Sequence, residues 1–367
     1  MNRIDARART PHRFREAGIS FAAIKKSIAE ENYENPTHVG LLYFFRDLIF
    51  FAACCAALII VDEWYLLVPL WVLSGMLISG LFVIGHDAAH GSLFANKRLA
   101  HWIAQICFLP AMNPFSQWAY GHNRVHHGRT VEVHADPVWH PTTPARYRAL
   151  SLPAKLLHRF YWSGFGAGFY YLVEIWLKKM LLDADHQKVR GALRDKIIVI
   201  GFGLGASAAL LYHGGGGSPS VADATFDWSA AVWMWVKVFA IPYLIWNYLS
   251  GTVVYMQHIH PSIPWLERDD WTPEYGQLFA TVNFHVPFFI NFFIHNILIH
   301  VPHHIQIRIP FYYLPEALRR MDAVWGDLMH QSDRPVREYL RIVRRCKLFE
   351  PGSGWYTYSA AREAFGR

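Results

Sequence analysis

The sequence carries little charge for its length. Only 17% of its 367 residues are charged, whereas 53% are hydrophobic, and an ordinary soluble domain has about 25% charged residues. The chain has too much apolar side chain to remain disordered and too little charge for a plain soluble globule. Its composition therefore favours a protein that sits in lipid.

Cysteine is also scarce. The chain has 4 cysteines, two of which (Cys54 and Cys55) are adjacent in an apolar run, and this arrangement excludes a disulfide scaffold. No Cys-x-x-Cys pair is present, which argues against a zinc site made of thiolates. The N-terminus is basic but has no apolar segment before about residue 40, so a cleaved signal peptide is not expected.

Four uncharged apolar runs approach the length of about 20 residues that a helix needs to cross a bilayer. They are Leu48–Val61, extended by His38–Phe45 if Arg46 and Asp47 pair or snorkel, and then Trp64–Gly85, Ile197–Tyr212 and Val238–Gln257. A fifth run, Leu278–Ile299, contains His285, Asn291 and His295, and is expected to be a re-entrant or buried segment rather than a span. The aromatic segment Tyr161–Leu182 is expected to lie in the membrane interface, with a helix of a soluble core as the alternative.

The basic residues indicate how these runs are oriented. The joints within the two pairs, Asp62-Glu63 and His213 to Asp227, contain no Lys or Arg, whereas basic residues are frequent before residue 43, between residues 131 and 196, and after residue 304. The positive-inside rule therefore places both termini and the middle segment in the cytoplasm. The net charge of +7 is then explained by cytoplasmic flanks, and nucleic-acid binding is not expected.

Histidine is the unusual residue type, with 21 copies. Three clusters near the cytoplasmic ends of the runs contain eight of them: HDAAH (His86, His90), HNRVHH (His122, His126, His127) and HVPHH (His300, His303, His304). On an α-helix, residues i and i+4 share a face, so His86 and His90 point the same way. His122 and His126 do so too, with His127 turned to one side. Pro302 can occupy the first turn of a short helix that carries the third cluster.

So many imidazoles indicate more than one metal ion. A structural zinc needs only four ligands, whereas eight or more nitrogens suffice for two metals with room for oxygen or solvent. Imidazole suits zinc, copper, iron and nickel. Two redox metals beside a membrane suggest oxygen activation, the kind of chemistry that attacks an unactivated C–H bond and that side chains alone cannot perform.

These motifs carry a family resemblance. IGHDAAHGSLF, GHNRVHHGRT and HVPHHIQIRIPFYYLPEA resemble the three histidine boxes of the membrane-bound fatty acid desaturases, and YMQHIHPSIPW and GISFAAIKKSI resemble stretches typical of the acyl-lipid Δ12 and ω3 branch. The resemblance covers roughly residues 18 to 318 and is specific at the boxes. One departure is that the second box has three residues between its first two histidines where two is common.

The resemblance implies a set of iron ligands. Two iron ions would be held by the eight box histidines and by one further histidine: His86, His90, His122, His126, His127, His300, His303, His304 and, as first choice for the ninth, His258, which closes the fourth run. His260 and His295 are the rival candidates. Asp87, inside the first box, is expected to orient a ligand imidazole through its distal nitrogen, with a helix-terminal acid as the alternative role.

The resemblance also implies an activity. The expected reaction is O2-dependent insertion of a cis double bond into the acyl chain of a membrane lipid, at the Δ12 or ω3 position, with electrons from ferredoxin or cytochrome b5. The sequence lacks the haem-binding signature His-Pro-Gly-Gly, so the donor is expected to be a separate protein. Two alternatives stay open: a di-iron hydroxylase or ketolase of acyl lipids or carotenoids, and a histidine-rich metal transporter.

The expected architecture is an all-α integral membrane bundle of about four transmembrane helices in two hairpins, with a cytoplasmic di-iron cap, in a bacterial cytoplasmic membrane. The whole chain, residues 1–367, is expected to form a single desaturase domain. Its expected parts are an N-terminal cytoplasmic segment, the first hairpin with a following apolar segment, a cytoplasmic or interfacial segment with the second box, the second hairpin, and a C-terminal cytoplasmic region with the third box; these are residues 1–42, 43–113, 114–195, 196–257 and 258–367.

Overall fold

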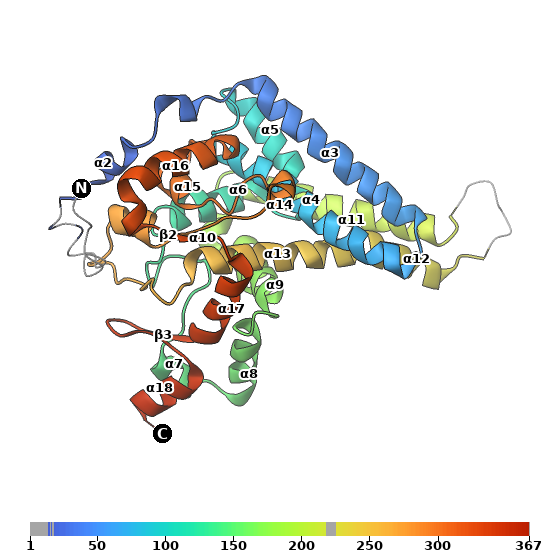
Figure 1. Cartoon of the computed structure of the whole chain (residues 1–367). Coiled ribbons are helices and arrows are strands. Elements are labelled where there is room, and N and C mark those ends of the chain that lie inside the picture. Colours follow the sequence, from blue (N-terminus) through green and yellow to red (C-terminus); the bar gives the residue numbers. More distant parts are fainter. Residues whose placement is uncertain (1–13, 15, 17, 218–224, 367) are drawn as a thin grey trace.

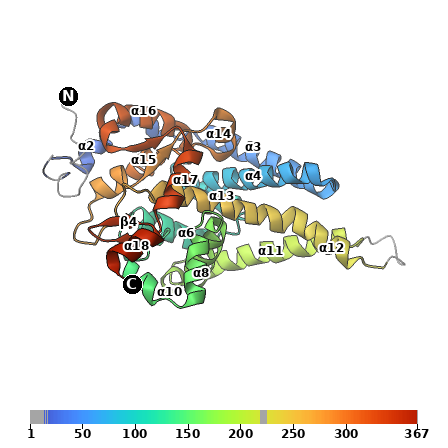
Figure 2. The ribbon, with the colours of Figure 1, turned by 60° about the horizontal axis from the view of Figure 1, so that its bottom comes forward.

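Four long helical segments organise the chain in a computed structural model that describes residues 14, 16, 18–217 and 225–366. They are α3 (Thr37–Ile60), α4 (Trp64–His90), α11 (Ala192–Gly214) and a continuous segment made of α12 (Trp228–Trp235), the π-helix η5 (Val236–Ala240) and α13 (Ile241–His258). In Figure 1 they run together toward the right, and most of the remaining chain gathers at their left ends. Figure 2 shows the same division from below.

The four segments match the expected membrane spans in number and composition. By length and hydropathy, 4 helices among the described residues can cross a bilayer: Thr37–Ile60, Trp64–His90, Ala192–Gly214 and Trp228–His258. Their surfaces carry exposed apolar side chains such as Ile60, Trp64 and Leu204, at 78%, 74% and 68% exposure, which water would disfavour and lipid would not. The chain is therefore an all-α membrane bundle, as the sequence predicts.

The first hairpin depends on an ion pair inside α3. Arg46 and Asp47 lie in the middle of this helix and bond to each other at 2.7 Å, with the Asp47 side chain almost fully buried. The pairing that the sequence required for a long first span is therefore present. Asp47 also bonds the His295 ring, and Arg46 donates to the Phe292 carbonyl, so the pair ties α3 to the segment before the third histidine cluster.

The last membrane helix, which is the second helix of the second hairpin, begins earlier than the sequence predicts. The expected start at Val238 is wrong, because the helix already begins at Trp228 and Lys237 lies inside it. Lys237 is 1% exposed, and its ammonium group donates to the carbonyls of Ile59 and Val61 and to the Asp62 carboxylate. A lysine with these partners satisfies the free carbonyls at the end of α3 and so joins the two hairpins.

The hairpins also meet along α4 and α13. A Cβ atom at Gly75 in α4 would lie 2.5 Å from the Ile245 side chain of α13, so only glycine allows this helix crossing. The expected third span, Ile197–Tyr212, is likewise longer, because α11 begins at Ala192 and includes three charged residues in its first turn and a half. In the joint expected from residue 213 to 227, residues 218–224 lie outside the described part of the chain.

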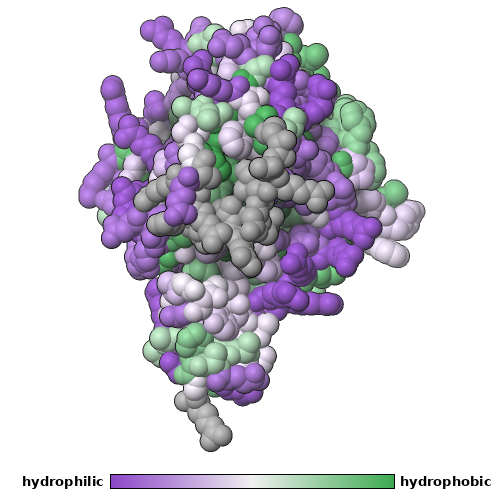
Figure 3. Space-filling model, turned by 60° about the vertical axis from the view of Figure 1, so that its left-hand side comes forward, coloured by the Kyte–Doolittle hydropathy of each residue, from purple (hydrophilic) through white to green (hydrophobic). Residues whose placement is uncertain are grey.

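The remaining elements form a cap at one end of the bundle. Figure 3 shows that end of the molecule, where hydrophilic side chains cover much of the surface. The short strands pair in two ribbons, β1 with β2 in parallel and β3 with β4 antiparallel. The elements, with their bounds, are α2 (Phe21–Lys25), η2 (Glu30–Tyr33), α5 (Lys97–Phe108), α6 (Phe115–Ala119), η3 (Tyr120–His126), α7 (Pro144–Ala149), α8 (Leu152–Tyr161), α9 (Ala167–Tyr170), η4 (Tyr171–Leu182), α10 (Ala184–Gln187), η6 (Tyr275–Phe279), β1 (Val282–Phe284), α14 (Phe288–Ile294), α15 (Val301–Ile305), η7 (Phe311–Tyr313), α16 (Leu314–Trp325), η8 (Gly326–Leu328), β2 (His330–Ser332), α17 (Pro335–Arg345), β3 (Leu348–Glu350), β4 (Gly354–Tyr356) and α18 (Tyr358–Phe365).

The fifth apolar run, Leu278–Ile299, is not a continuous helix. It contains β1, the seven-residue helix α14 and a turn in which His295 and Asn296 both have positive φ angles, of 51° and 56°. This segment is therefore too broken to span, as the sequence suggests. The interfacial position of Tyr161–Leu182 stays a prediction, but this segment is also irregular, with α9 followed by the π-helix η4.

Replacing Lys237 by methionine should destabilise the protein. Methionine fills a similar volume but leaves the Ile59 and Val61 carbonyls without their donor, and each unpaired buried group costs about 1–3 kcal/mol. We expect a clear drop in the melting temperature of the detergent-purified protein. Lys178→Met, which removes an exposed pair with Glu174, is the matched control and should change stability by less than about 1 kcal/mol. Equal melting temperatures for both variants would contradict this role of Lys237.

Candidate metal centre

The first histidine pair lies on the last turn of a membrane helix. His86 and His90 are both in α4, which ends where Gly91 adopts a left-handed conformation with φ of 70°. The spacing i, i+4 puts both rings on one face, as the sequence predicts, and their centroids are 4.6 Å apart. Both side chains point into the interior, with 3% and 9% exposure.

The second cluster differs from the expected α-helix. It lies on the π-helix η3, in which the His127 amide donates to the His122 carbonyl five residues earlier. The prediction that His127 turns to one side is therefore wrong, because a π-turn is wider than an α-turn and lets residues i, i+4 and i+5 converge. The Nε2 atom of His127 lies 3.1 Å from that of His122.

The third cluster begins just before the short helix α15. Pro302 occupies its first turn, as expected, and the amides of His300 and Val301 both donate to the Asn283 carboxamide oxygen, at 2.8 and 2.9 Å. Asn283 thus caps this helix and fixes the start of the cluster. His300, His303 and His304 are each buried, with at most 3% exposure.

These elements bring eight imidazoles together in two groups of four, with a ninth beside them. Within each group, the nitrogens lie within 4.8 Å of one another. The first group contains His86, His90, His122 and His303, and the second contains His126, His258, His300 and His304. His127 adjoins the first group, because its Nε2 atom is 3.1 Å from those of both His122 and His303. The structure thus places His258, the last residue of α13, with the box histidines.

The contacts within the groups suit a shared cation. The Nε2 atoms of His86 and His122 are 3.0 Å apart, and those of His300 lie 3.0 Å from His258 and 2.9 Å from His304. Asp87 and Gln277 accept at Nδ1 of His86 and His304, so the Nε2 atoms of these two neutral rings present lone pairs to the groups. His90 is buried with no hydrogen-bond partner on either ring nitrogen among the described residues. Buried polar atoms normally have a bonding partner, and a metal ion ligated by these nitrogens would supply one.

The rings are held in the form that ligates metals. Burial, together with the neighbouring imidazoles, lowers the pKa of His122, His127, His300, His303 and His304 well below the usual value. These groups are therefore neutral at physiological pH, with a lone pair available.

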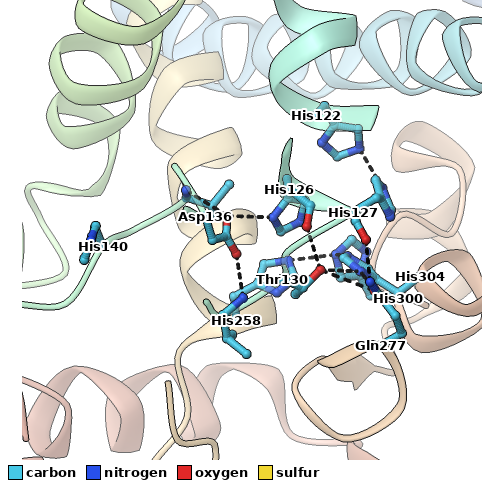
Figure 4. Close-up of polar contacts among 12 residues, drawn as sticks. His122, His126, His127, Thr130, Asp136, His140, His258, Gln277, His300 and His304 are labelled. Carbon is cyan, nitrogen blue, oxygen red and sulfur yellow. Dashed lines mark hydrogen bonds and ion pairs between the residues drawn. The ribbon is translucent and has the colours of Figure 1, made fainter. Parts of the chain in front are cut away.

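Polar side chains outside the groups orient several rings (Figure 4). Asp136 accepts from Nδ1 of His126 at 2.9 Å, and its other oxygen accepts from the Val131 amide. The Gln277 oxygen lies 2.7 Å from Nδ1 of His304. These contacts direct each Nε2 atom inward. Sequence reasoning missed Asp136, Gln277 and Asn283; only the position of Asp136, nine residues after the second cluster, gave any signal.

Asp87 has the geometry expected of an orienting carboxylate. One of its oxygens lies 2.8 Å from Nδ1 of His86, and the other accepts from the Phe311 amide at 2.7 Å. The two rival candidates for the ninth ligand lie elsewhere. His260 bonds Glu338 at 3.0 Å, and His295 bonds Asp47; neither belongs to a group.

A largely apolar cavity of about 370 Å³ opens beside both groups. Its lining follows α4 from Met76 to His86, with α13 and α14 on other sides, and includes ring faces of His122, His126 and His300. Lys179 and His186 also line it. A volume of this size and apolar character is typical of a small-molecule site.

The fold and the histidine groups together define a membrane protein with a buried polyhistidine site suited to metal ions. Within that class, the chain belongs to the fatty acid desaturase family, because the family model described as fatty acid desaturase matches residues 63–334. The resemblance inferred from the three boxes is thereby confirmed, and the chain is an oxidoreductase of this family.

Several relatives are similar over most of the chain. An sn-1 oleoyl-lipid 12-desaturase of Picosynechococcus sp. is 27% identical over 299 residues, which cover 82% of this chain and 81% of the relative. An sn-1 acyl-lipid omega-3 desaturase (ferredoxin) of Nostoc sp. is 27% identical over 344 residues, covering 92% and 90%. A chloroplastic omega-6 fatty acid desaturase of Glycine max is 28% identical over 293 residues, covering 78% and 63%.

Replacing Asp136 by asparagine should weaken metal binding. The variant loses the charge that polarises the His126 ring, and such outer carboxylates typically contribute 10–100-fold to metal affinity. We expect a loss of about that size in the chelator concentration needed to strip half of the bound metal, measured by elemental analysis. Asp185→Asn, at an exposed ion pair with Lys188, is the control. Unchanged metal retention in Asp136→Asn would exclude the orienting role.

Proposed function

We propose that this protein is an O2-dependent acyl-lipid desaturase that inserts a cis double bond at the Δ12 or ω3 position of a membrane lipid. The observation that carries the proposal is the contact between the two histidine groups and an apolar cavity beside α4 and α13. The relatives named as oleoyl-lipid 12-desaturase and acyl-lipid omega-3 desaturase support the choice of substrate and position.

The nine imidazoles are the proposed ligands of two iron ions. His86, His90, His122, His127 and His303 would hold one ion, and His126, His258, His300 and His304 the other. All are nitrogen ligands, which suit iron, and family membership makes iron the preferred metal. When bound, the pair of irons would supply the activation of O2 that removal of hydrogen from an acyl methylene requires.

The chain's own residues then position the substrate and exclude water. The cavity side chains from α4 are mostly apolar and would hold an acyl chain by burying its methylenes. Met76 is ten residues before His86 along α4, a distance of about 15 Å. The acyl chain would therefore extend about that far into the bundle past the metal groups, which limits the part of the chain beyond the new double bond.

The orienting carboxylates have a complementary role. Asp87 and Asp136 would hold the Nδ1 protons of His86 and His126 and so keep each Nε2 lone pair directed at a metal. Gln277 would do the same for His304 through its carboxamide oxygen. These second contacts stabilise the ligand geometry without taking part in proton transfer to the substrate.

The proposal also includes the orientation of the chain in the membrane and the source of its electrons. The distribution of basic residues supports a cytoplasmic location for both termini and for the histidine groups, in a bacterial cytoplasmic membrane, with the whole chain as one desaturase domain. The Nostoc relative is named as a ferredoxin-type enzyme, which supports a separate ferredoxin as electron donor here. The basic cytoplasmic surface would steer such an acidic protein.

Expression in a host that makes monounsaturated lipids and supplies reduced ferredoxin tests this function. We expect a new dienoic or trienoic acid, located by gas chromatography–mass spectrometry of double-bond derivatives. His304→Ala should lower the product more than about 100-fold, since loss of a ligand exceeds the effect of an outer-shell change. His285→Ala, at a largely exposed histidine outside both groups, should retain activity. A hydroxylated or keto product, or full activity of His304→Ala, would contradict the proposal.

A further inference from the structure

The helix α17 carries an arginine-rich face that the proposed catalysis does not use. Arg337, Arg341, Arg344 and Arg345 are all exposed, and Arg334 precedes the helix. Among the ion pairs of the described residues, only Arg341 of these arginines has an acidic partner, Glu338. Glu338 is itself turned inward, toward His260. The outward face therefore has positive charge without matching acids, and an anionic partner would complement it.

An apolar stripe lies beside these arginines. Val336 and Leu340, one turn apart on the helix, are 72% and 47% exposed. At 100° per residue, they fall between the arginine face and the face formed by Tyr339 and Val343, which packs on Gly164. A basic face next to an exposed apolar stripe is typical of helices that lie in a membrane surface.

The position of α17 along the bundle is that of the membrane surface. The Tyr339 hydroxyl donates to the Gly164 carbonyl at 2.7 Å, and the centroid of its ring lies 6.3 Å from that of Tyr255 in α13. The helical segment Trp228–His258 has 31 residues, about 46 Å, whereas the hydrocarbon core is about 30 Å thick. Lys237 lies level with Asp62 at the outer end of the first hairpin, so a crossing of about 20 residues that starts there ends near Gln257. Tyr339 contacts α13 at Tyr255 and so lies close to the boundary between hydrocarbon and headgroups.

The neighbouring surface is apolar at the same level. Gly164, which α17 contacts, is followed by Phe165 with 81% exposure, and Phe160 and Phe169 on either side are 41% and 50% exposed. The helix α8 before them exposes Leu152 and Leu156, at 70% and 59%. These side chains and the apolar stripe of α17 belong to segments that pack together, and such a surface would cost free energy in water.

We propose that α8, the Gly164 turn and α17 form an interfacial platform that lies in the cytoplasmic membrane surface, where the arginines of α17 bind the phosphates of anionic lipids. Val336, Leu340 and the phenylalanines around Gly164 enter the acyl boundary. The guanidinium groups reach outward to headgroup phosphates, which they match in geometry and charge. The proposal rests on the position of α17 relative to the membrane and on its charge. It does not depend on the reaction that the protein catalyses.

The first test measures the depth of α17 in the bilayer. A nitroxide is attached to Leu340→Cys in the full-length protein in nanodiscs, in a Cys55→Ala background because the other three cysteines are buried. We expect collisions with O2 to exceed those with a water-soluble nickel chelate, as for a site in lipid. The same label at Asp269→Cys, an exposed position in a loop of the cap outside α8 and α17, is the control and should give the opposite ratio. Equal exposure of both labels to the nickel chelate would overturn the interfacial position.

The second test measures the anionic lipid directly. Arg337→Gln, Arg341→Gln and Arg344→Gln are combined, and the phosphatidylglycerol retained from mixed phosphatidylcholine nanodiscs is quantified by mass spectrometry. Each arginine near an anionic surface contributes about fivefold, so the preference for phosphatidylglycerol should fall on the order of 100-fold. The control, Arg319→Gln with Arg320→Gln on α16, should keep that preference. An unchanged preference in the triple variant would overturn the headgroup site.

A third outcome would assign the arginine face to a different partner. If the label at position 340 is exposed to water and the triple variant instead raises the KM for ferredoxin, α17 docks the soluble donor and the lipid proposal fails. Normal metal content in all variants, measured alongside, shows that each result concerns the surface rather than the fold. Loss of acyl product in the unmodified protein would bear on the proposed function and leave the platform intact.

Discussion

The burial of nine imidazoles whose nitrogens converge is the constraint on which the rest of this structure depends. Their Nε2 atoms face one another at about 3 Å, and a neutral ring has only one proton to donate, so a shared metal ion would complete bonds that the rings cannot all make with each other. Metal ions bound there would stabilise the cap, and folding and metal binding are expected to be coupled.

Two of the membrane helices, α4 and α13, end at the histidine groups and contribute residues to them. The last turn of α4 brings His86 and His90, the last residue of α13 is His258, and the apolar cavity follows the same two helices into the bundle. One architecture thus supplies both the proposed ligands and an apolar cavity beside them. The link through Lys237 and the close crossing at Gly75 fix the relative height of the two hairpins, and so fix the two ends at which these ligands lie.

Much of this arrangement could be predicted from the sequence, because it follows from composition and local spacing. The four spans and the pairing of Arg46 with Asp47 rest on apolar length, and the box histidines on spacing and family resemblance. The early start of the last span could not be predicted, because a lysine interrupts the run and only the distant Ile59 carbonyl and Asp62 explain its burial. The π-helix that turns His127 inward and the supporting contacts from Asp136 and Gln277 also depend on tertiary packing. The sequence favours His258 over His260 and His295 because it closes the fourth run, and the structure groups it with the box histidines.

The number and kind of metal ions bound by each chain test the central claim most directly. Elemental analysis of the purified protein, combined with Mössbauer spectroscopy of iron-57-enriched samples, would measure both. The account predicts two irons per chain, in nitrogen-rich environments. A single ion, or a full complement of zinc in protein that forms product, would contradict it.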